Sequence, residues 1–572
     1  MKRGGRQTVI ELFDTTLRDG TQGAGMSLSV DDKLKIARAL DRLGVHYIEG
    51  GWPGSNPKDE LFFKEARSLR LQNAKLTAFG STRRKDRAAH NDPNLQAILR
   101  VRTPAACIFG KSWDLHVVHA LRASLEENLS MIRESVAFLK RKGKTVIYDA
   151  EHFFDGFAAN PRYALKTLKA ARSAGADNLT LCDTNGGSLP SRVARTIRAV
   201  RRELGDAGLG IHTHNDSDCA VANAMTAVEE GCRLVQGTVN GYGERCGNAN
   251  LISVIANLRL KLGLESVTEE QLRSLTEISR YVSEVANIVP NDHQPYAGLS
   301  AFAHKGGVHV SAMARHASTY EHVDPAVVGN QRRILISELS GQANVLLKAR
   351  ELNLDFSRDD RAVQTVIDAV KKMEHQGYQF EGAEGSFAVL VRKALGQHRK
   401  YFDLLGFRVS VEKNARTGKV VSEAALRLRV NGLVQRAVAK GDGPVNALDN
   451  ALRKALNRSY PQLRSVSLTD FKVRVIDASR GTKAKVRVLI ESRDEKDEWS
   501  TVGVSENIIE ASWQALVDSI EYKLFSIEPP GPGGDELKKH GEKSSKIAII
   551  ENSASKNAAA AGAGRPRKRR RT

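Results

Sequence analysis

The stretch Val9-Ile-Glu-Leu-Phe-Asp-Thr-Thr-Leu-Arg-Asp-Gly20 decides the fold, because it opens the first of eight similar units. Its apolar run ends in the polar residues Arg18 and Asp19, and an amphipathic segment follows at Ser29–Leu43. Ser29 is a residue type that commonly caps a helix N-terminus. A short apolar run followed by a helical period predicts a strand and then a helix.

The same pattern repeats as far as about residue 265. The eight apolar runs are Val9–Leu17, Val45–Gly51, Lys75–Ser81, Ala106–Gly110, Thr145–Ala150, Asn178–Cys182, Gly210–Thr213 and Leu234–Val239. Eight strands alternating with helices over this length predict an α/β fold, namely a (β/α)₈ TIM barrel. An open doubly wound sheet is the alternative topology, and it would place its ligand at a single switch point.

Polar residues follow many of the runs, which favours the barrel over the open sheet. They are Arg18 and Asp19 after run one, Glu49 in run two, Glu151 after run five, Asp183 and Thr184 after run six, His212 and His214 around the end of run seven, and Asn248 after run eight. In a barrel the carboxyl ends of all strands meet on one face, where the active site is built. We therefore expect these residues to share one site.

Two histidines in this set have the spacing of a metal site. His212 and His214 project from the same side of a strand, because side chains alternate with period two. Asp19, on a strand near strand seven in a closed barrel, adds an oxygen ligand, and Asn248 can add a neutral oxygen. Such a donor set suits Mn²⁺, Zn²⁺, Fe²⁺ or Co²⁺, and Mg²⁺ if water completes the shell. Alternatively, His212 and His214 bind no metal and are only polar residues that form hydrogen bonds at the strand end.

Three further residues have the chemistry of catalysis. Arg18 can bind a carboxylate or stabilise an alkoxide, although a structural ion pair with Glu49 is the alternative. Glu151 and His309 are acid–base candidates, and His309 lies in a glycine-rich stretch where a lone histidine is often incidental. The glycines of Gly241–Gly247 lack the dinucleotide-binding spacing, so we interpret them as shaping the loop that carries Asn248.

The chain length of 572 residues requires more than one domain. We predict a catalytic barrel at 8–265, a helical linker region completing the active site at 266–395, a C-terminal α+β regulatory and dimerisation domain at 396–527, and a disordered basic tail at 528–572. The C-terminal domain is predicted from four apolar runs and two helices. The runs are Phe407–Glu412, Ala424–Val430, Thr469–Val475 and Ala484–Glu491, and the helices are Pro444–Leu456 and Ile508–Tyr522.

Composition excludes several classes of protein. No run approaches the roughly 20 apolar residues of a membrane span, and five scattered cysteines without a C-x-x-C pair suit a reducing compartment, so we expect a cytoplasmic protein. The net charge is +21, and residues 537–572 contribute eleven Lys and Arg against two Glu, a net +9. A solvated tail explains this concentration, and weak non-specific polyanion binding is the alternative.

Three motifs resemble the metal-dependent acyl-CoA condensing barrels, a family that includes 2-isopropylmalate, homocitrate and citramalate synthases and the cleaving enzyme hydroxymethylglutaryl-CoA lyase. The motifs are F-D-T-T-L-R-D-G at Phe13–Gly20, H-T-H-N-D at His212–Asp216 and G-E-R-C-G-N-A at Gly243–Ala249. The likeness extends over about residues 8–525. Within the family, Ile48–Pro57 and Asp149–Asp155 are most similar to the citramalate synthase branch.

This resemblance implies that acetyl-CoA, pyruvate and water give citramalate and CoA, an entry to isoleucine biosynthesis. It also implies a homodimer with isoleucine as effector. By motif, the metal ligands would be Asp19, His212, His214 and Asn248, the 2-oxo acid would be held by Arg18 and Thr184, and the acetyl-CoA side would be served by Glu151, His309 and Tyr320. A 2-isopropylmalate synthase using 2-oxoisovalerate in leucine biosynthesis, a homocitrate synthase and a lyase are the alternatives.

Overall fold

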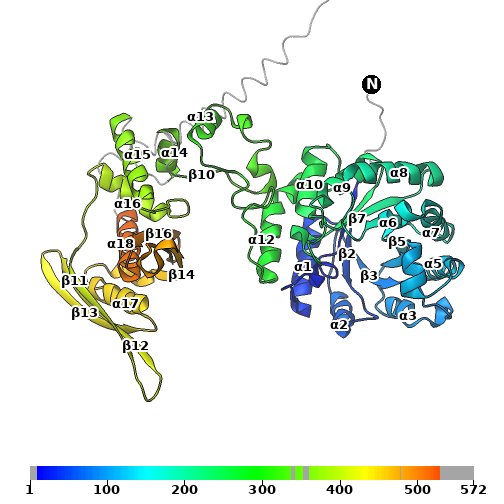
Figure 1. Ribbon diagram of the computed structural model, residues 1–572, viewed down its shortest axis with the longest axis horizontal. Coiled ribbons are helices and arrows are strands. Elements are labelled where there is room, and N and C mark those ends of the chain that lie inside the picture. Colours follow the sequence, from blue (N-terminus) through cyan, green and yellow to red (C-terminus); the bar gives the residue numbers. More distant parts are fainter. Residues whose placement is uncertain (1–8, 337–341, 352–359, 477, 528–572) are drawn as a thin grey trace, which may run out of the picture. The chain divides into compact units, whose positions relative to one another are not determined.

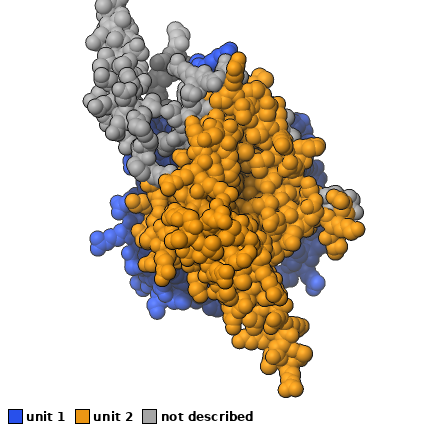
Figure 2. All heavy atoms as spheres, turned by 90° about the vertical axis from the view of Figure 1, so that its left-hand side faces the viewer, with its two compact units in different colours: residues 1–304, 312–334 blue, residues 305–311, 335–572 orange. Residues whose placement is uncertain are grey.

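The computed structural model describes residues 9–336, 342–351, 360–476 and 478–527. The basic residues before Val9 and the predicted basic tail at 528–572 lie outside these ranges. The chain divides into two compact units, one made of residues 1–304 and 312–334 and the other of residues 305–311 and 335–572 (Figure 2). No helix in the described part of the chain is both long enough and apolar enough to cross a membrane.

The first unit contains a closed barrel of eight parallel strands, which confirms the predicted (β/α)₈ fold (Figure 1). The strands, in order around the barrel, are β1 (Glu11–Asp14), β2 (Tyr47–Gly51), β3 (Lys75–Ser81), β4 (Ala105–Lys111), β5 (Thr145–Glu151), β6 (Asn178–Asp183), β7 (Leu209–Thr213) and β8 (Leu234–Gly237). Strand β1 closes the ring by pairing with both β2 and β8. Closure brings the ends of β1, β7 and β8 together, although they are far apart in the sequence.

Helices follow the strands and cover the barrel with an apolar layer. They are α1 (Val30–Leu43), α2 (Pro57–Ala66), α3 (Pro93–Arg100), α4 (Asp114–His116), α5 (Leu125–Arg141), α6 (Phe153–Ala159), α7 (Pro161–Ser173), α8 (Pro190–Leu204) and α9 (Ala220–Glu229). In α1 the predicted N-cap Ser29 accepts a hydrogen bond from the Asp32 amide, and the Asp32 carboxylate accepts one from the Ser29 amide. This capping box defines where the helix begins.

Strand register places the polar residues of the barrel in two neighbouring rows. His212 on β7 is opposite Cys182 on β6 and Gln236 on β8, and Asp149 on β5 is opposite Thr180 on β6. A separate buried cluster that includes Phe13, Tyr47, Phe79, Cys107 and Ile147 fills space between strands β1 to β5. The barrel is therefore a packed core with its polar layer toward the strand ends.

Beyond the barrel the chain is mainly helical. The elements are α10 (Leu251–Leu260), α11 (Glu269–Arg273), α12 (Leu275–Val285), β9 (Ala303–His304), α13 (Gly307–Arg315), β10 (Arg333–Ile334), α14 (Gln342–Glu351), α15 (Asp360–His375) and α16 (Glu384–Ala394). Helices α15 and α16 belong to the second unit, in which Val366, Val370 and Phe387 lie in one buried cluster. The two short strands β9 and β10 pair in parallel and are additions to the predicted helical pattern.

In residues 403–476 and 478–526, which the structure describes, the second unit has two antiparallel three-stranded sheets and two α-helices, which confirms the predicted α+β class. The elements are β11 (Asp403–Lys413), β12 (Val420–Val430), β13 (Leu433–Gly441), α17 (Pro444–Leu456), β14 (Ser467–Val475), β15 (Val486–Arg493), β16 (Glu498–Ser505) and α18 (Ile508–Ser526). Strands β13 and β16 have no counterpart among the predicted runs. Most side chains of β13 are exposed or half-buried and two of them, Arg436 and Lys440, are basic, so its apolar pattern is weak.

Candidate active site

A pocket of about 220 Å³ opens at the carboxyl ends of the barrel strands. Its lining residues are Arg18, Asp19, Gln22, Trp52, Phe79, Phe109, Asp149, Glu151, Cys182, Thr184, His212, His214, Glu244 and Arg245. One part of the wall is aromatic, with the Trp52 ring packed edge-on against Phe79 and Phe109. The pocket therefore combines a charged region with an apolar wall, as small-molecule sites commonly do.

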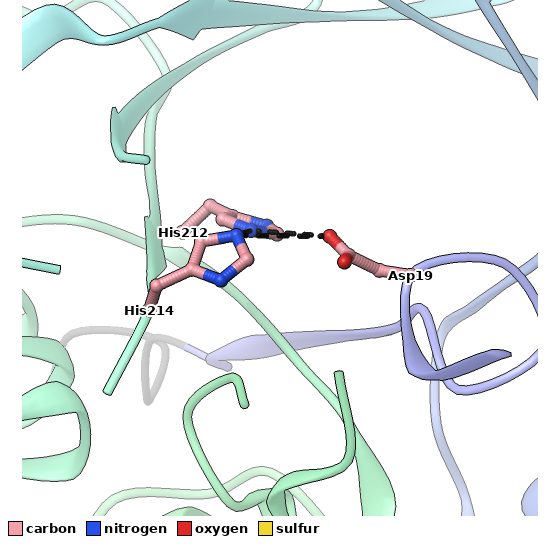
Figure 3. A group of neighbouring side chains, drawn as sticks. All are labelled: Asp19, His212 and His214. Carbon is pink, nitrogen blue, oxygen red and sulfur yellow. Dashed lines mark hydrogen bonds and ion pairs between the residues drawn. The ribbon is translucent and has the colours of Figure 1, made fainter. Parts of the chain in front are cut away.

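Asp19, His212 and His214 converge on one point of this pocket (Figure 3). The Nε2 atoms of the two imidazoles are 3.3 Å apart, and Oδ2 of Asp19 lies 3.5 Å from Nε2 of His212 and 3.9 Å from Nε2 of His214. All three side chains are buried. Three ligand atoms that face one another at this spacing suit a single divalent cation.

Asn248 lies beside this cluster, and its side-chain amide contacts Asp19. Its Nδ2 donates to the backbone carbonyl of Tyr242, and its backbone pairs with His214 in an isolated antiparallel bridge. Its Oδ1 is buried and has no hydrogen-bond partner. A buried acceptor without a partner costs free energy, and coordination of a cation beside Asp19 would satisfy it. The residues present therefore fit a divalent metal.

The protonation states also fit metal binding. Burial lowers the pKa of His214 to about 4, with repulsion from His212 acting in the same direction. Burial opposes ionisation of Asp19, but Arg18 and then the two imidazoles hold its pKa below the ordinary value. Near neutral pH the site therefore presents a neutral imidazole and a carboxylate, which are the forms that bind metals.

Arg18 lies beside this cluster, and its ion pair with Glu49, the alternative role expected from the sequence, is present. Its Nε donates to Oε1 of Glu49 at 2.7 Å, and its Nη1 lies 3.3 Å from Oδ2 of Asp19. The guanidinium stacks over the Phe79 ring, 3.7 Å from the centroid. Glu49 is fully buried, so the ion pair fixes the direction of the guanidinium at the wall of the pocket.

Glu151 and Thr184 line the pocket on β5 and in the loop after β6. The Glu151 carboxylate makes an ion pair with Lys111, which the sequence did not single out. The hydroxyl of Thr184 accepts a hydrogen bond from the His152 amide at 2.9 Å. Its own hydrogen therefore remains available to donate to a carboxylate in the pocket.

Arg245 is a second cation of the pocket that the sequence did not single out. It makes two hydrogen bonds to the Asp216 carboxylate, at 2.7 and 3.0 Å, and donates to the backbone carbonyl of Thr184 at 2.7 Å. These contacts lock the loop after β8 to the loops after β6 and β7. Arg245 lies in the same short motif as Asn248, and this position in the sequence could have identified it as a pocket residue.

The two remaining predicted residues lie outside the barrel loops. His309 is on α13, in the stretch 305–311 that belongs to the second unit. Tyr320 follows a short 3₁₀ helix at Ala317–Thr319, is 43% exposed and is not among the described residues that line the pocket. Their roles remain predictions.

Comparison with known families gives the same order of domains as the structure. Residues 9–282 match the HMGL-like family, residues 297–378 match a homocitrate synthase post-HMGL domain-like family, and residues 381–524 match the LeuA allosteric (dimerisation) domain. The chain therefore carries a barrel of the HMGL-like type and a regulatory dimerisation domain.

Relatives that match over nearly the whole of their length identify the branch of the family. The (R)-citramalate synthase of Geobacter sulfurreducens is 55% identical over 91% of this chain and 98% of its own, and that of Aquifex aeolicus is 51% identical over 91% and 99%. The 2-isopropylmalate synthase of Methanocaldococcus jannaschii is 30% identical over 91% of this chain and 95% of its own. The resemblance to the citramalate synthase branch is thus confirmed, and the chain belongs to the (R)-citramalate synthase family.

Proposed function

We propose that this protein condenses acetyl-CoA with pyruvate and water to give citramalate and CoA. The observation that carries the proposal is the convergence of Asp19, His212 and His214 beside Arg18 in one buried pocket. Five relatives named (R)-citramalate synthase are 46–55% identical to this chain, whereas the 2-isopropylmalate synthase of Methanocaldococcus jannaschii is 30% identical. A pocket of about 220 Å³ suits a small 2-oxo acid.

A divalent cation (Mn²⁺, Mg²⁺, Zn²⁺ or Co²⁺) held by Asp19, His212, His214 and Asn248 would supply Lewis acidity toward the keto group of pyruvate. Arg18 stabilises the alkoxide that develops on that oxygen, because Glu49 and Asp19 fix the guanidinium in place. Thr184 donates its hydroxyl hydrogen to the pyruvate carboxylate.

Glu151 is the base that removes a methyl proton from acetyl-CoA, and its ion pair with Lys111 keeps the carboxylate at the pocket wall. The enolate carbon then forms a bond to the keto carbon of pyruvate as the carbonyl π bond breaks, and the resulting alkoxide takes up a proton to become the tertiary hydroxyl of citramalate. Water cleaves the thioester, which releases CoA as a thiol and leaves the second carboxylate of citramalate. His309 and Tyr320 act on the acetyl-CoA side, as the family motifs imply.

The test is an assay of CoA release with pyruvate, 2-oxoisovalerate and 2-oxoglutarate at equal concentrations. We expect pyruvate to give the highest kcat/KM. A single methylene in an apolar pocket changes kcat/KM by about 10–200-fold, so the three acids should separate clearly. A preference for 2-oxoisovalerate would instead assign the protein to 2-isopropylmalate synthesis, for which the 30% identical relative is the supporting observation.

We also propose that the protein is a cytoplasmic homodimer inhibited by isoleucine through its C-terminal unit. The match of residues 381–524 to an allosteric dimerisation domain supports this assignment. The outer side of β13 presents Val434 and Val438, which are 52% and 49% exposed, on the face opposite the buried Ala437. A second copy of the chain is the partner that would cover these valines.

A further inference from the structure

Behind His212 the barrel holds a row of buried polar side chains that the proposed reaction does not use. Nδ1 of His212 lies 2.8 Å from Oε1 of Gln236, and Nε2 of Gln236 donates to Oδ1 of Asp149 at 2.8 Å. Gln236 is 1% exposed and Asp149 is 4% exposed. Because bulk water is excluded from Gln236, its two amide ends depend on these protein partners.

The direction of each hydrogen bond in this row follows from Asp149. An ionised Asp149 only accepts, so the amide nitrogen of Gln236 faces Asp149 and the amide oxygen faces His212. The thiol of Cys107 is a second donor to Asp149, in keeping with its role as acceptor. An amide oxygen also only accepts, so Nδ1 of His212 must carry the hydrogen.

A hydrogen on Nδ1 leaves Nε2 of the neutral His212 ring with its lone pair. That Nε2 is the atom that faces Asp19 and His214. The chain therefore holds His212 in the one tautomer that can coordinate a cation at the point where the three ligands converge. The opposite orientation of the Gln236 amide would place a hydrogen on Nε2 and block coordination.

We propose that Gln236 and Asp149 are positioning residues that act through His212 to set the metal affinity of this site. This inference rests on the metal site of the proposed function but is independent of the identity of the 2-oxo acid. Partners that hold a ligating histidine in this way change metal affinity by about 10–100-fold when they are removed.

The first test measures binding of Mn²⁺ to the metal-free full-length protein by calorimetry, without substrates. Gln236→Met keeps the length of the side chain and removes both hydrogen bonds, so the dissociation constant should rise by about 10–100-fold. Thr180→Val is the matched control in the same layer, because Thr180 is only a second and longer acceptor for Gln236, at 3.3 Å. It should leave the dissociation constant near the wild-type value.

The second test reverses the direction of the hydrogen bond between positions 149 and 236. Asp149→Asn alone allows the Gln236 amide to turn and should weaken binding. Gln236→Glu alone places two carboxylates together and should also weaken Mn²⁺ binding. The double variant lets the Asn amide donate to the Glu carboxylate, which again accepts from Nδ1 of His212. It should recover most of the lost affinity, a coupling that independent effects would not produce.

Circular dichroism and thermal melting of every variant identify those that have failed to fold. The proposal is overturned if folded Gln236→Met binds Mn²⁺ as tightly as the wild type, if Thr180→Val is equally damaging, or if the double variant loses the sum of both single effects. Wild-type protein that binds no Mn²⁺ would overturn the metal site and this inference together. Wild-type protein that binds Mn²⁺ but does not turn over pyruvate would overturn only the proposed function.

Discussion

The barrel and the C-terminal unit are both built from strands and helices, but they use their strands differently. The barrel closes its parallel sheet, so the strand ends meet and Asp19, His212 and His214 form a buried cluster. The C-terminal unit has two open antiparallel sheets, and on β13 the valines Val434 and Val438 are about half exposed. Closure of the barrel thus brings polar side chains together at one point, whereas an open sheet leaves apolar surface at which another protein chain can bind.

The largest expected effect comes from removing a metal ligand in the barrel. Asp19→Ala should abolish both Mn²⁺ uptake and CoA release, because it removes the carboxylate that faces both imidazoles. Calorimetry on the metal-free protein and the CoA assay measure the two losses. His90→Ala, which changes an exposed histidine of the same unit, is the control and should behave as the wild type. Full activity of Asp19→Ala in metal-depleted buffer would refute the site.

Glu151→Gln should lower kcat by about 10²–10⁴-fold, the usual contribution of a general base. The amide keeps the shape of the side chain but cannot take the methyl proton. Stopped assays with [methyl-²H]acetyl-CoA check the same step through exchange of label with water, which should also be lost. Glu126→Gln, an exposed change at the start of α5, is the control. Unchanged exchange in Glu151→Gln would assign the base to another residue.

Arg18→Lys should lower kcat/KM for pyruvate by about 10²–10³-fold, as loss of a donor to a developing oxyanion does. Lysine keeps the charge but lacks the planar fork that spans Glu49 and Asp19. Steady-state kinetics with varied pyruvate measure the effect. Arg38→Lys on the exposed side of α1 serves as the matched change. Wild-type kinetics in Arg18→Lys would show that Arg18 has only a structural ion-pair role.

The smallest effect on turnover is expected in the C-terminal unit. The double change Val434→Asp with Val438→Asp should raise the dimer dissociation constant at least about tenfold, or roughly 1.4 kcal/mol, while kcat changes little. Sedimentation velocity measures the dimer, and inhibition by isoleucine should weaken in parallel. Val289→Asp, at a valine that is 90% exposed in the first unit, is the control. An unaltered dimer would place the subunit interface elsewhere on the chain.

The fold was largely predictable because its signals are local. The period-two spacing of His212 and His214 and the capping residue Ser29 depend only on a few neighbouring residues. Polar residues after successive apolar runs indicated the shared face, since parallel strands in a barrel end together. Strand β13 was not predicted because its exposed side weakens the apolar pattern. Strand β16 was not predicted because Ser500, Thr501 and Gly503 interrupt its apolar residues.

The sequence by itself determined which residue types stand at the strand ends, and hence the barrel and the donor set Asp19, His212 and His214. Only the tertiary structure decided how those residues are held. Lys111 meets Glu151 on the neighbouring strand, and Gln236 reaches Asp149 across 87 positions of sequence. The physical reason is that hydrogen-bond direction in a buried layer depends on which strands closure brings together, and no local period encodes those pairings.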